Sequence, residues 1–175
     1  PLALLFNIIW PPIQNGLDSL AMWMAGSGVI GIFLFGFLNR ALIPVGLHHV
    51  INSYLWFQMG SFTNAAGDVV MGDIPRFLAG DPTAGVFMTG LYPVFLFGLP
   101  GACLAMYKCA KKDKKSEVKS LMISGAGTCF IAGITEPVEF LFEFVSPKLY
   151  LLHCLFSGLG GAIFYFMNVR LGISY

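Results

Sequence analysis

The chain has 175 residues and a formal net charge of +1; 57% of its residues are hydrophobic and only 11% are charged. Soluble domains carry about 25% charged residues, so this composition is that of a membrane protein. The near-zero net charge argues against a nucleic-acid partner, which would require a concentrated basic face. The four cysteines show no metal-type spacing, and we interpret them as reduced, buried small side chains: Cys103, Cys109, Cys129 and Cys154.

The first forty residues divide at their few charges. Residues 1 to 17 are uncharged, and Pro11-Pro12 predicts a short apolar helix followed by an amphipathic continuation. Between Asp18 and Arg40 lie 21 uncharged residues (19 to 39), enough for a membrane span of about 20 residues. Several small residues would let this span pack closely against neighbouring helices: Gly26, Gly28, Gly31 and Gly36.

The next segment is more polar. From Arg40 to Asp68 the sequence includes Pro44, His48 and His49, and we expect a broken or interior helix that runs into a polar loop. Residues 60 to 85 are rich in glycine and proline, which is typical of turns. Connections of this length are usually functional or disordered, so we predict a functional re-entrant loop here.

Two further spans flank a basic loop. Asp81 to Lys108 encloses 26 uncharged residues (82 to 107), with a kink expected at Gly98-Leu99-Pro100-Gly101. Six of the ten basic residues lie between Lys108 and Lys119, and the positive-inside rule places this loop, 108–119, in the cytoplasm. Residues 149 to 169 give another uncharged stretch of 21 residues, which we predict to be a further span.

A carboxylate next to backbone breakers marks the stretch Gly133-Ile134-Thr135-Glu136-Pro137-Val138-Glu139-Phe140. Sixteen uncharged residues (120 to 135) precede Glu136; as a helix they extend about 24 Å, less than a hydrocarbon core of about 30 Å. The glycine and the proline allow a helix to stop there. An intramembrane carboxylate at such a break indicates a functional site. The alternative is a helix cap at the bilayer surface, with Thr135 capping and the glutamates in water.

The candidate polar groups suit a sugar. Glu136, Glu139 and Glu143 share one helix face, and Glu136 is our functional candidate because helix N-termini favour negative charge. The pair His48-His49 does not match zinc spacing, and a purely structural hydrogen-bonding role for it stays open. The spacing of Arg40 does not decide whether it points inward. Such a lining, with many aromatic residues, suits a neutral polyhydroxylated ligand.

Several motifs resemble one family, the membrane component (IIC) of the bacterial phosphoenolpyruvate-dependent sugar phosphotransferase system, in its glucose superfamily. They are Asn39-Arg40-Ala41-Leu42-Ile43-Pro44-Val45-Gly46-Leu47-His48-His49, the stretch around Glu136, and the blocks at 62–67, 72–77 and 97–102. Within the superfamily, the compact loop from Asp73 to Thr83 and the run Asn64-Ala65-Ala66-Gly67 are most similar to the N-acetylglucosamine-specific permeases.

The resemblance implies an all-α, polytopic integral membrane fold with transmembrane helices and re-entrant hairpins. Residues 1–17 would be the end of an amino-terminal helical domain and an amphipathic connector. Residues 18–175 would be the sugar-binding transport domain, incomplete at its carboxy terminus. It also implies a multi-pass location in the bacterial inner membrane and a homodimer for the full-length protein.

The same resemblance implies a site and a reaction. Glu136, Thr135, His48, Arg40 and Asn64 would bind N-acetylglucosamine or glucose, and Glu136 or His48 would act in catalysis. The sugar's 6-hydroxyl would be phosphorylated by a IIB partner, itself supplied by IIA, so the phosphoryl-donating residue is expected outside this chain. No cofactor or metal is expected. The alternatives are a proton-coupled secondary sugar transporter without phosphoryl transfer and a purely structural membrane subunit.

Overall fold

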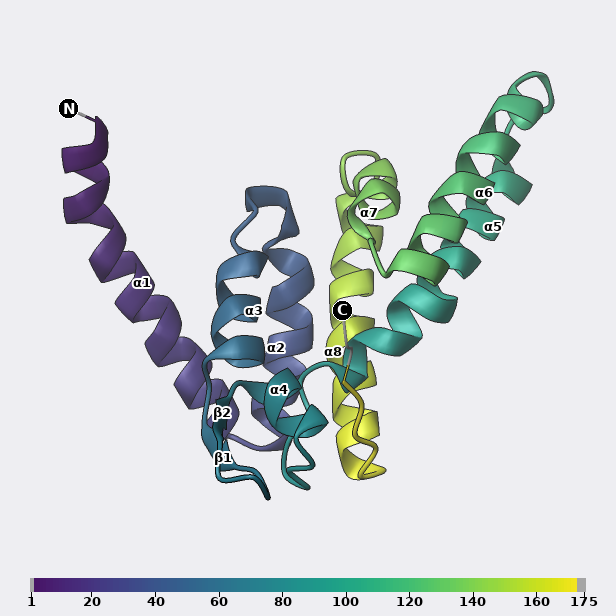
Figure 1. Cartoon of the computed structure of the whole chain (residues 1–175). Helices are drawn as coiled ribbons and strands as arrows, with labels where there is room; N and C mark the ends of the chain where they lie inside the picture. The colour runs from purple at the N-terminus through teal and green to yellow at the C-terminus, as the bar shows by residue number, and fades with distance from the viewer. Residues whose placement is uncertain (1, 173–175) are drawn as a thin grey trace.

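The computed structural model describes residues 2–172, apart from the side chain of Leu17, and this part of the chain is mostly helical (Figure 1). The first half contains α1 (Leu2–Gly26), α2 (Val29–Ala41), a 3-10 turn (Ile43–Val45), α3 (His48–Phe57), β1 (Ser61–Thr63), β2 (Val69–Met71) and α4 (Asp73–Leu78).

The second half begins with irregular helical turns and ends in long helices. It contains a 3-10 turn (Thr89–Leu91), a π-helical turn (Val94–Gly98), α5 (Leu99–Cys109), a 3-10 turn (Lys112–Lys114), α6 (Lys115–Ala132), α7 (Glu136–Glu143) and α8 (Pro147–Phe166). In Figure 1, α5 and α6 form a hairpin that projects from the rest of the molecule, with the lysine-rich loop at its tip.

The amino-terminal helix differs from the prediction in two ways. It continues through Pro11 and Pro12, so the expected break there was wrong; proline bends a helix but need not end it. The single span expected over residues 19 to 39 was also wrong, because the chain turns between α1 and α2. Gly28 has a φ of 58°, a left-handed backbone that glycine adopts readily, and this turn folds α2 back against α1.

A small β-hairpin qualifies the all-α prediction. β1 and β2 pair antiparallel, with Ser61 opposite Met71 and Thr63 opposite Val69. Each strand has only three residues, too few for an alternating pattern to stand out in the sequence. The segment was expected to be turns and loop, and the strands lie inside it.

The predicted elements that follow are confirmed in position. The interior helix is α3, which runs into the β-hairpin. At the expected kink a π-helical turn, Val94–Gly98, passes into α5, and the bend itself stays a prediction. The last apolar stretch forms α8. Among the cysteines the interpretation as buried thiols was wrong for Cys109, which is exposed because it ends α5 beside the lysine-rich loop.

Buried ionic contacts fix the connection between α4 and the second half. Arg76 and Asp81 form an ion pair of 2.6 Å, and the Thr83 hydroxyl donates to Asp81. Burial alone would raise the pKa of Asp81, but the hydrogen bonds from Thr83 and Arg76 outweigh it and lower that pKa. The carboxylate of Asp73 accepts from the backbone N–H groups of Gly85 and Phe87. This long connection is therefore an ordered structure.

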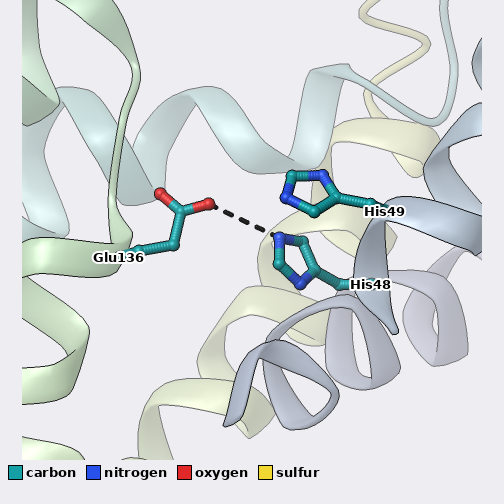
Figure 2. Close-up of side chains that lie close together, drawn as sticks. All are labelled: His48, His49 and Glu136. Carbon is teal, nitrogen blue, oxygen red and sulfur yellow. Dashed lines mark ion pairs between the residues drawn. The ribbon is translucent and has the colours of Figure 1, made fainter. Parts of the chain in front are cut away.

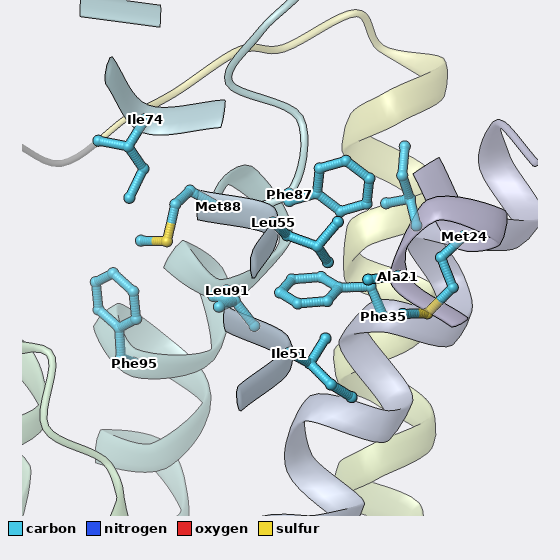
Figure 3. Packing of buried hydrophobic residues seen from close by; sticks show 11 residues of the cluster. Ala21, Met24, Phe35, Ile51, Leu55, Ile74, Phe87, Met88, Leu91 and Phe95 are labelled. Carbon is cyan, nitrogen blue, oxygen red and sulfur yellow. The ribbon is translucent and has the colours of Figure 1, made fainter. Parts of the chain in front are cut away.

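The main hydrophobic core lies where α1, α2, α3 and α4 meet the segment 87–95 (Figure 3). Phe35 and Phe87 meet edge to face at its centre, with ring centroids 5.4 Å apart. A second cluster joins α5, α6 and α7 and consists of Val94, Leu99, Cys103, Met122, Cys129 and Val138.

Helices α2 and α8 pack backbone against backbone. A Cβ added to Gly36 would lie 2.8 Å from the carbonyl oxygen of Ser157, and one added to Gly158 would lie 2.6 Å from that of Phe33. Small residues permit this close approach between membrane helices. We call Gly36 and Gly158 the glycine seam.

The outside of the molecule is strongly apolar. Helices α1 and α8 expose many large hydrophobic side chains, including Leu4, Ile8, Leu151 and Phe156. Within residues 2–172, two helical segments are long and apolar enough to cross a membrane: Thr89–Cys109, which runs from the 3-10 turn through the π-helical turn into α5, and Pro147–Phe166, which is α8. Exposed apolar helix surfaces of this extent fit contact with lipid or with other protein segments.

We expect Gly158→Ala to destabilise the protein by about 1–3 kcal/mol, because the added methyl overpacks the glycine seam. The matched control is Gly127→Ala in α6, where an added Cβ meets nothing within 4 Å. Alanine favours helix over glycine by about 1 kcal/mol, so this change is expected to be neutral or stabilising. Thermal unfolding of the two purified variants in detergent measures the difference, and equal midpoints would contradict the close packing of α2 on α8.

Candidate functional site

The break between α6 and α7 places a carboxylate at a helix start, as the sequence predicted. Gly133 ends α6 in the left-handed conformation, with a φ of 67°. Thr135 precedes α7, and Glu136 and Pro137 open it. Proline suits the first turn of a helix because the N–H that it lacks would have no partner there. The positive end of the helix dipole favours the Glu136 carboxylate.

Two histidines from another helix face this carboxylate (Figure 2). The Nε2 atom of His48, at the start of α3, lies 3.4 Å from Glu136 Oε1. The rings of His48 and His49 are close together, with centroids 3.9 Å apart. His48 is buried and His49 is exposed. The Glu136 side chain is 31% exposed, and its second oxygen accepts from the backbone N–H of Thr135 at 3.0 Å.

These residues border a cavity of about 320 Å³. Its walls come from α2, α3, the segment 88–95 and the α6–α7 break, and its lining is Asn39, Arg40, His48, His49, Asn52, Trp56, Met88, Leu91, Phe95, Ala132, Gly133, Ile134, Thr135 and Glu136. The volume lies at the small end of the range of about 300–1,000 Å³ for ligand pockets. The structure thus brings together four of the five predicted sugar-binding residues.

Unpaired polar atoms gather in this cavity. In residues 2–172, five buried side-chain nitrogen or oxygen atoms lack a hydrogen-bond partner, and four belong to lining residues: Arg40 Nε, His48 Nδ1, His48 Nε2 and Trp56 Nε1. The 3.4 Å contact of His48 with Glu136 is an ion-pair distance without hydrogen-bond alignment. Buried polar groups are normally satisfied, so these unpaired atoms indicate a place for a polar ligand.

Arg40 is held by partners beneath the cavity. Its Nη1 atom donates to the Thr135 hydroxyl at 2.7 Å and to Glu139 Oε1 at 2.9 Å. Both ends of the ion pair are buried, with side-chain exposures of 6% for Arg40 and 0% for Glu139. The last turn of α2 carries Arg40, where the helix dipole favours a cation. The guanidinium thereby fixes α7 to α2.

Helix α8 completes this buried cluster. His153 Nε2 lies 2.7 Å from Glu139 Oε1, and the Tyr150 hydroxyl donates to the carbonyl oxygen of Arg40 at 2.5 Å. A buried carboxylate requires paired charge and hydrogen bonds, and Glu139 obtains both from two different helices. We call Arg40, Glu139, His153 and Tyr150 the anchor network.

The anchor network was not predicted from the sequence. The spacing put Glu139 on the same helix face as Glu136 but indicated no partner for it, and no pattern pointed to His153 or Tyr150. Arg40 and Glu139 are nearly one hundred residues apart in the sequence, so no local sequence pattern predicts their contact. One general rule could have helped: a carboxylate on a buried helix face needs a cationic or hydrogen-bonding partner. Applied to Glu139, that rule directs the search to polar side chains in the apolar spans, and His153 is one of them.

Asn64 is the predicted residue that the structure does not bring to the cavity. It lies in the turn between β1 and β2, where its side-chain carbonyl accepts from the backbone N–H groups of Ala66 and Asp68, both at 2.9 Å. This is the usual local role of asparagine in a turn. The assignment of Asn64 to a sugar stays a prediction.

A larger cavity of about 480 Å³ lies between α5, α7 and α8. Its lining is almost wholly apolar, and His153 and Ser157 are its polar side chains. The Ser157 hydroxyl donates to the carbonyl oxygen of His153, and His153 belongs to the anchor network. Because a polar ligand needs several free donors and acceptors, the smaller cavity at Glu136 is the stronger candidate site.

Comparison with known proteins identifies a family for this chain. Residues 1–158 match the family described as "Phosphotransferase system, EIIC". The N-acetylglucosamine-specific EIICBA component of Escherichia coli (strain K12) is 49% identical over 99% of this chain, and the N-acetylglucosamine-specific EIIC component of Streptomyces coelicolor is 49% identical over 97%. The glucose-specific EIICBA component of Staphylococcus carnosus is 46% identical over 99%.

The chain spans only part of these relatives. It covers 27% of the length of the Escherichia coli protein and 41% of the Streptomyces coelicolor protein. The family match nevertheless extends over most of the chain and includes both motifs that border the cavity. The resemblance inferred from the sequence is therefore confirmed, and the chain belongs to the phosphotransferase system EIIC family.

Proposed function

We propose that this chain is the sugar-translocating part of a phosphotransferase system and that it binds N-acetylglucosamine in the cavity at Glu136. Relatives that are 49% identical carry N-acetylglucosamine in their names, and one at 46% carries glucose. The names favour N-acetylglucosamine by a small margin, and the compact 73–83 loop favours it too. Glucose is the second substrate to test.

The observation that carries this proposal is the set of unpaired polar atoms in the cavity. Arg40 Nε, the ring nitrogens of His48 and Trp56 Nε1 are buried without hydrogen-bond partners, and the Glu136 carboxylate lines the same cavity. A sugar offers hydroxyls that both donate and accept, together with apolar ring faces that pack on aromatic side chains. Glu136 would accept from hydroxyl donors, His48 and Arg40 would donate, and Trp56 would supply both a ring and an N–H group.

The proposed reaction is phosphorylation of the bound sugar's 6-hydroxyl by a phosphorylated IIB partner, which IIA supplies. EIIC components belong to phosphotransferase systems but are not their phosphorylated part, so this chain's task is to hold and orient the acceptor. Positioning and charge stabilisation do most of the work in phosphoryl transfer. Glu136 or His48 would act as general base where one of them reaches that hydroxyl.

The membrane arrangement that we propose has the chain crossing the bacterial inner membrane several times. The basic tip of the α5–α6 hairpin would lie in the cytoplasm. Helix α7 has 8 residues, or about 12 Å of helix, too short to cross, so α6–α7 would form a re-entrant segment around the cavity. Residues 18–175 would form the transport domain, with 1–17 as connector, and the full-length protein would be a homodimer.

Glu136→Gln is expected to weaken N-acetylglucosamine binding by about 10- to 100-fold, since hydrogen bonds to charged groups contribute about 1.5–3 kcal/mol. Phosphoenolpyruvate-dependent phosphorylation should fall with it. The measurement is sugar binding and phosphorylation in vesicles that carry the full-length permease, with glucose as competitor. Glu117→Gln is the matched control, because Glu117 is exposed and contacts Lys114 near the basic loop.

Each result of this comparison is informative. Unchanged binding in Glu136→Gln would remove the carboxylate from the proposed site. Uptake that follows a proton gradient and ignores phosphoenolpyruvate would favour the secondary transporter instead. Equal competition by glucose would overturn the preference for N-acetylglucosamine and leave the site in place.

Glu139→Gln is expected to act through stability and position. Breaking a buried ion pair costs about 3–5 kcal/mol because the other charge is left uncompensated, so the variant should unfold at a clearly lower temperature. Sugar affinity should fall too, since Arg40 holds the Thr135 hydroxyl beside Glu136. The measurements are thermal unfolding and N-acetylglucosamine titration on the same full-length protein.

A double variant separates the two effects. Arg40→Met with Glu139→Leu removes both charges, and apolar replacements of a buried pair are often neutral or stabilising. We expect this variant to recover thermal stability relative to Glu139→Gln while its sugar affinity stays low, because Arg40 no longer donates to the sugar or to the Thr135 hydroxyl. Recovery of both properties would show that neither Arg40 nor its pairing with Glu139 contributes to sugar binding.

A further inference from the structure

Three metal-ligating side chains converge at the α3–α7 contact (Figure 2). One ligand atom each from His48, His49 and Glu136 lies within 4.8 Å of the other two. The histidines are adjacent in sequence and come from α3, whereas Glu136 comes from α7. The pair His48-His49 does not match zinc spacing along the sequence, but the fold brings Glu136 beside it as a third candidate ligand.

A second observation points to a ligand at this place. His48 is 6% exposed, and both of its ring nitrogens are buried without a hydrogen-bond partner. The His49 ring, tilted by 37° against that of His48, brings a second imidazole to the same place. A buried imidazole without hydrogen-bond partners is costly, and a metal ion is one of the groups that satisfies it. The Glu136 carboxylate supplies negative charge to the cluster.

We propose that His48, His49 and Glu136 form a site for a divalent transition-metal cation, of which Zn²⁺ fits best. Two imidazoles and one carboxylate are a known zinc donor set, and imidazole suits zinc, copper and nickel whereas magnesium and calcium prefer oxygen ligands. Bonds of about 2.0–2.1 Å place two ligands of one ion at most about 4.2 Å apart. A small rotation of the exposed His49 side chain would bring the three ligand atoms within this distance of one another.

The metal would inhibit the permease. Because Glu136 and His48 are also the residues that we propose to hold the sugar, a bound cation would occupy the same groups and compete with N-acetylglucosamine. This competition rests on the proposed function, whereas metal binding itself does not. The cavity would thus accept two classes of ligand, a sugar and an inhibitory metal cation.

The test uses the full-length permease purified in detergent, stripped with a chelator and dialysed. Zn²⁺ is titrated calorimetrically into wild type and His49→Gln, with Mg²⁺ as the hard-cation comparison. We expect the variant to bind Zn²⁺ at least about tenfold more weakly, since loss of even an outer-shell partner costs about 10- to 100-fold. Mg²⁺ should show no binding at this site.

Two further variants keep the result interpretable. His49→Cys replaces one zinc ligand by another and should restore much of the affinity, which a purely structural role of His49 would not predict. Cys109→Ser removes the exposed thiol at the end of α5 and should leave the zinc affinity unchanged. Thermal unfolding of the stripped proteins checks that each variant is folded.

The outcomes separate the metal site from the sugar site. Equal zinc affinity in wild type and His49→Gln, or no zinc binding at all, overturns the proposed metal site. If zinc binds through His49 but saturating zinc leaves N-acetylglucosamine affinity unchanged, the competition is wrong. A metal-free wild type that binds no sugar would refute the proposed function without touching the zinc result.

Discussion

The buried ion pair between Arg40 and Glu139 is the contact on which the rest of the site depends. Taking two charges out of water is costly, and such a pair adds little net stability compared with apolar residues. The pair mainly determines geometry, because any arrangement that separates the two buried charges is strongly unfavourable. Helices α2 and α7, which lie far apart in the sequence, are thereby held in one orientation, and His153 brings α8 into the same arrangement.

The Arg40–Glu139 ion pair gives different surroundings to Glu136 and Glu139, which lie three residues apart. Glu139 is fully buried and its charge is matched by Arg40 inside the protein. Glu136, one turn earlier, is partly exposed to the cavity and meets an incompletely bonded histidine. Because the cation beneath is already neutralised, the carboxylate of Glu136 stays available to a ligand. Two glutamates on one helix therefore have different roles: Glu139 holds helices together inside the protein, and Glu136 is available to a ligand in the cavity.

The sequence was informative where local chemistry decides structure. Glycine and proline around Glu136 predicted the break before α7, and the lysine cluster predicted the loop between α5 and α6. The turn at Gly28 was missed because charge spacing measures length and says nothing about where a long apolar stretch folds back. The anchor network was missed for a different reason: it joins residues from three helices, and pairing over such separations is settled by packing. Asn64 was assigned by motif, whereas its turn uses the side chain locally.

The glycine seam has a mechanical consequence. Where two helices touch through side chains, rotamer changes let them slide past one another at small cost. At the seam, by contrast, carbonyl oxygens of one helix lie against the α-carbons of the other, and main-chain atoms have no alternative rotamers. Helices α2 and α8 therefore form a rigid pair that resists sliding. Because Arg40 lies in the last turn of α2 and His153 lies on α8, a motion of one helix would carry the other helix and the anchor network with it as a rigid body.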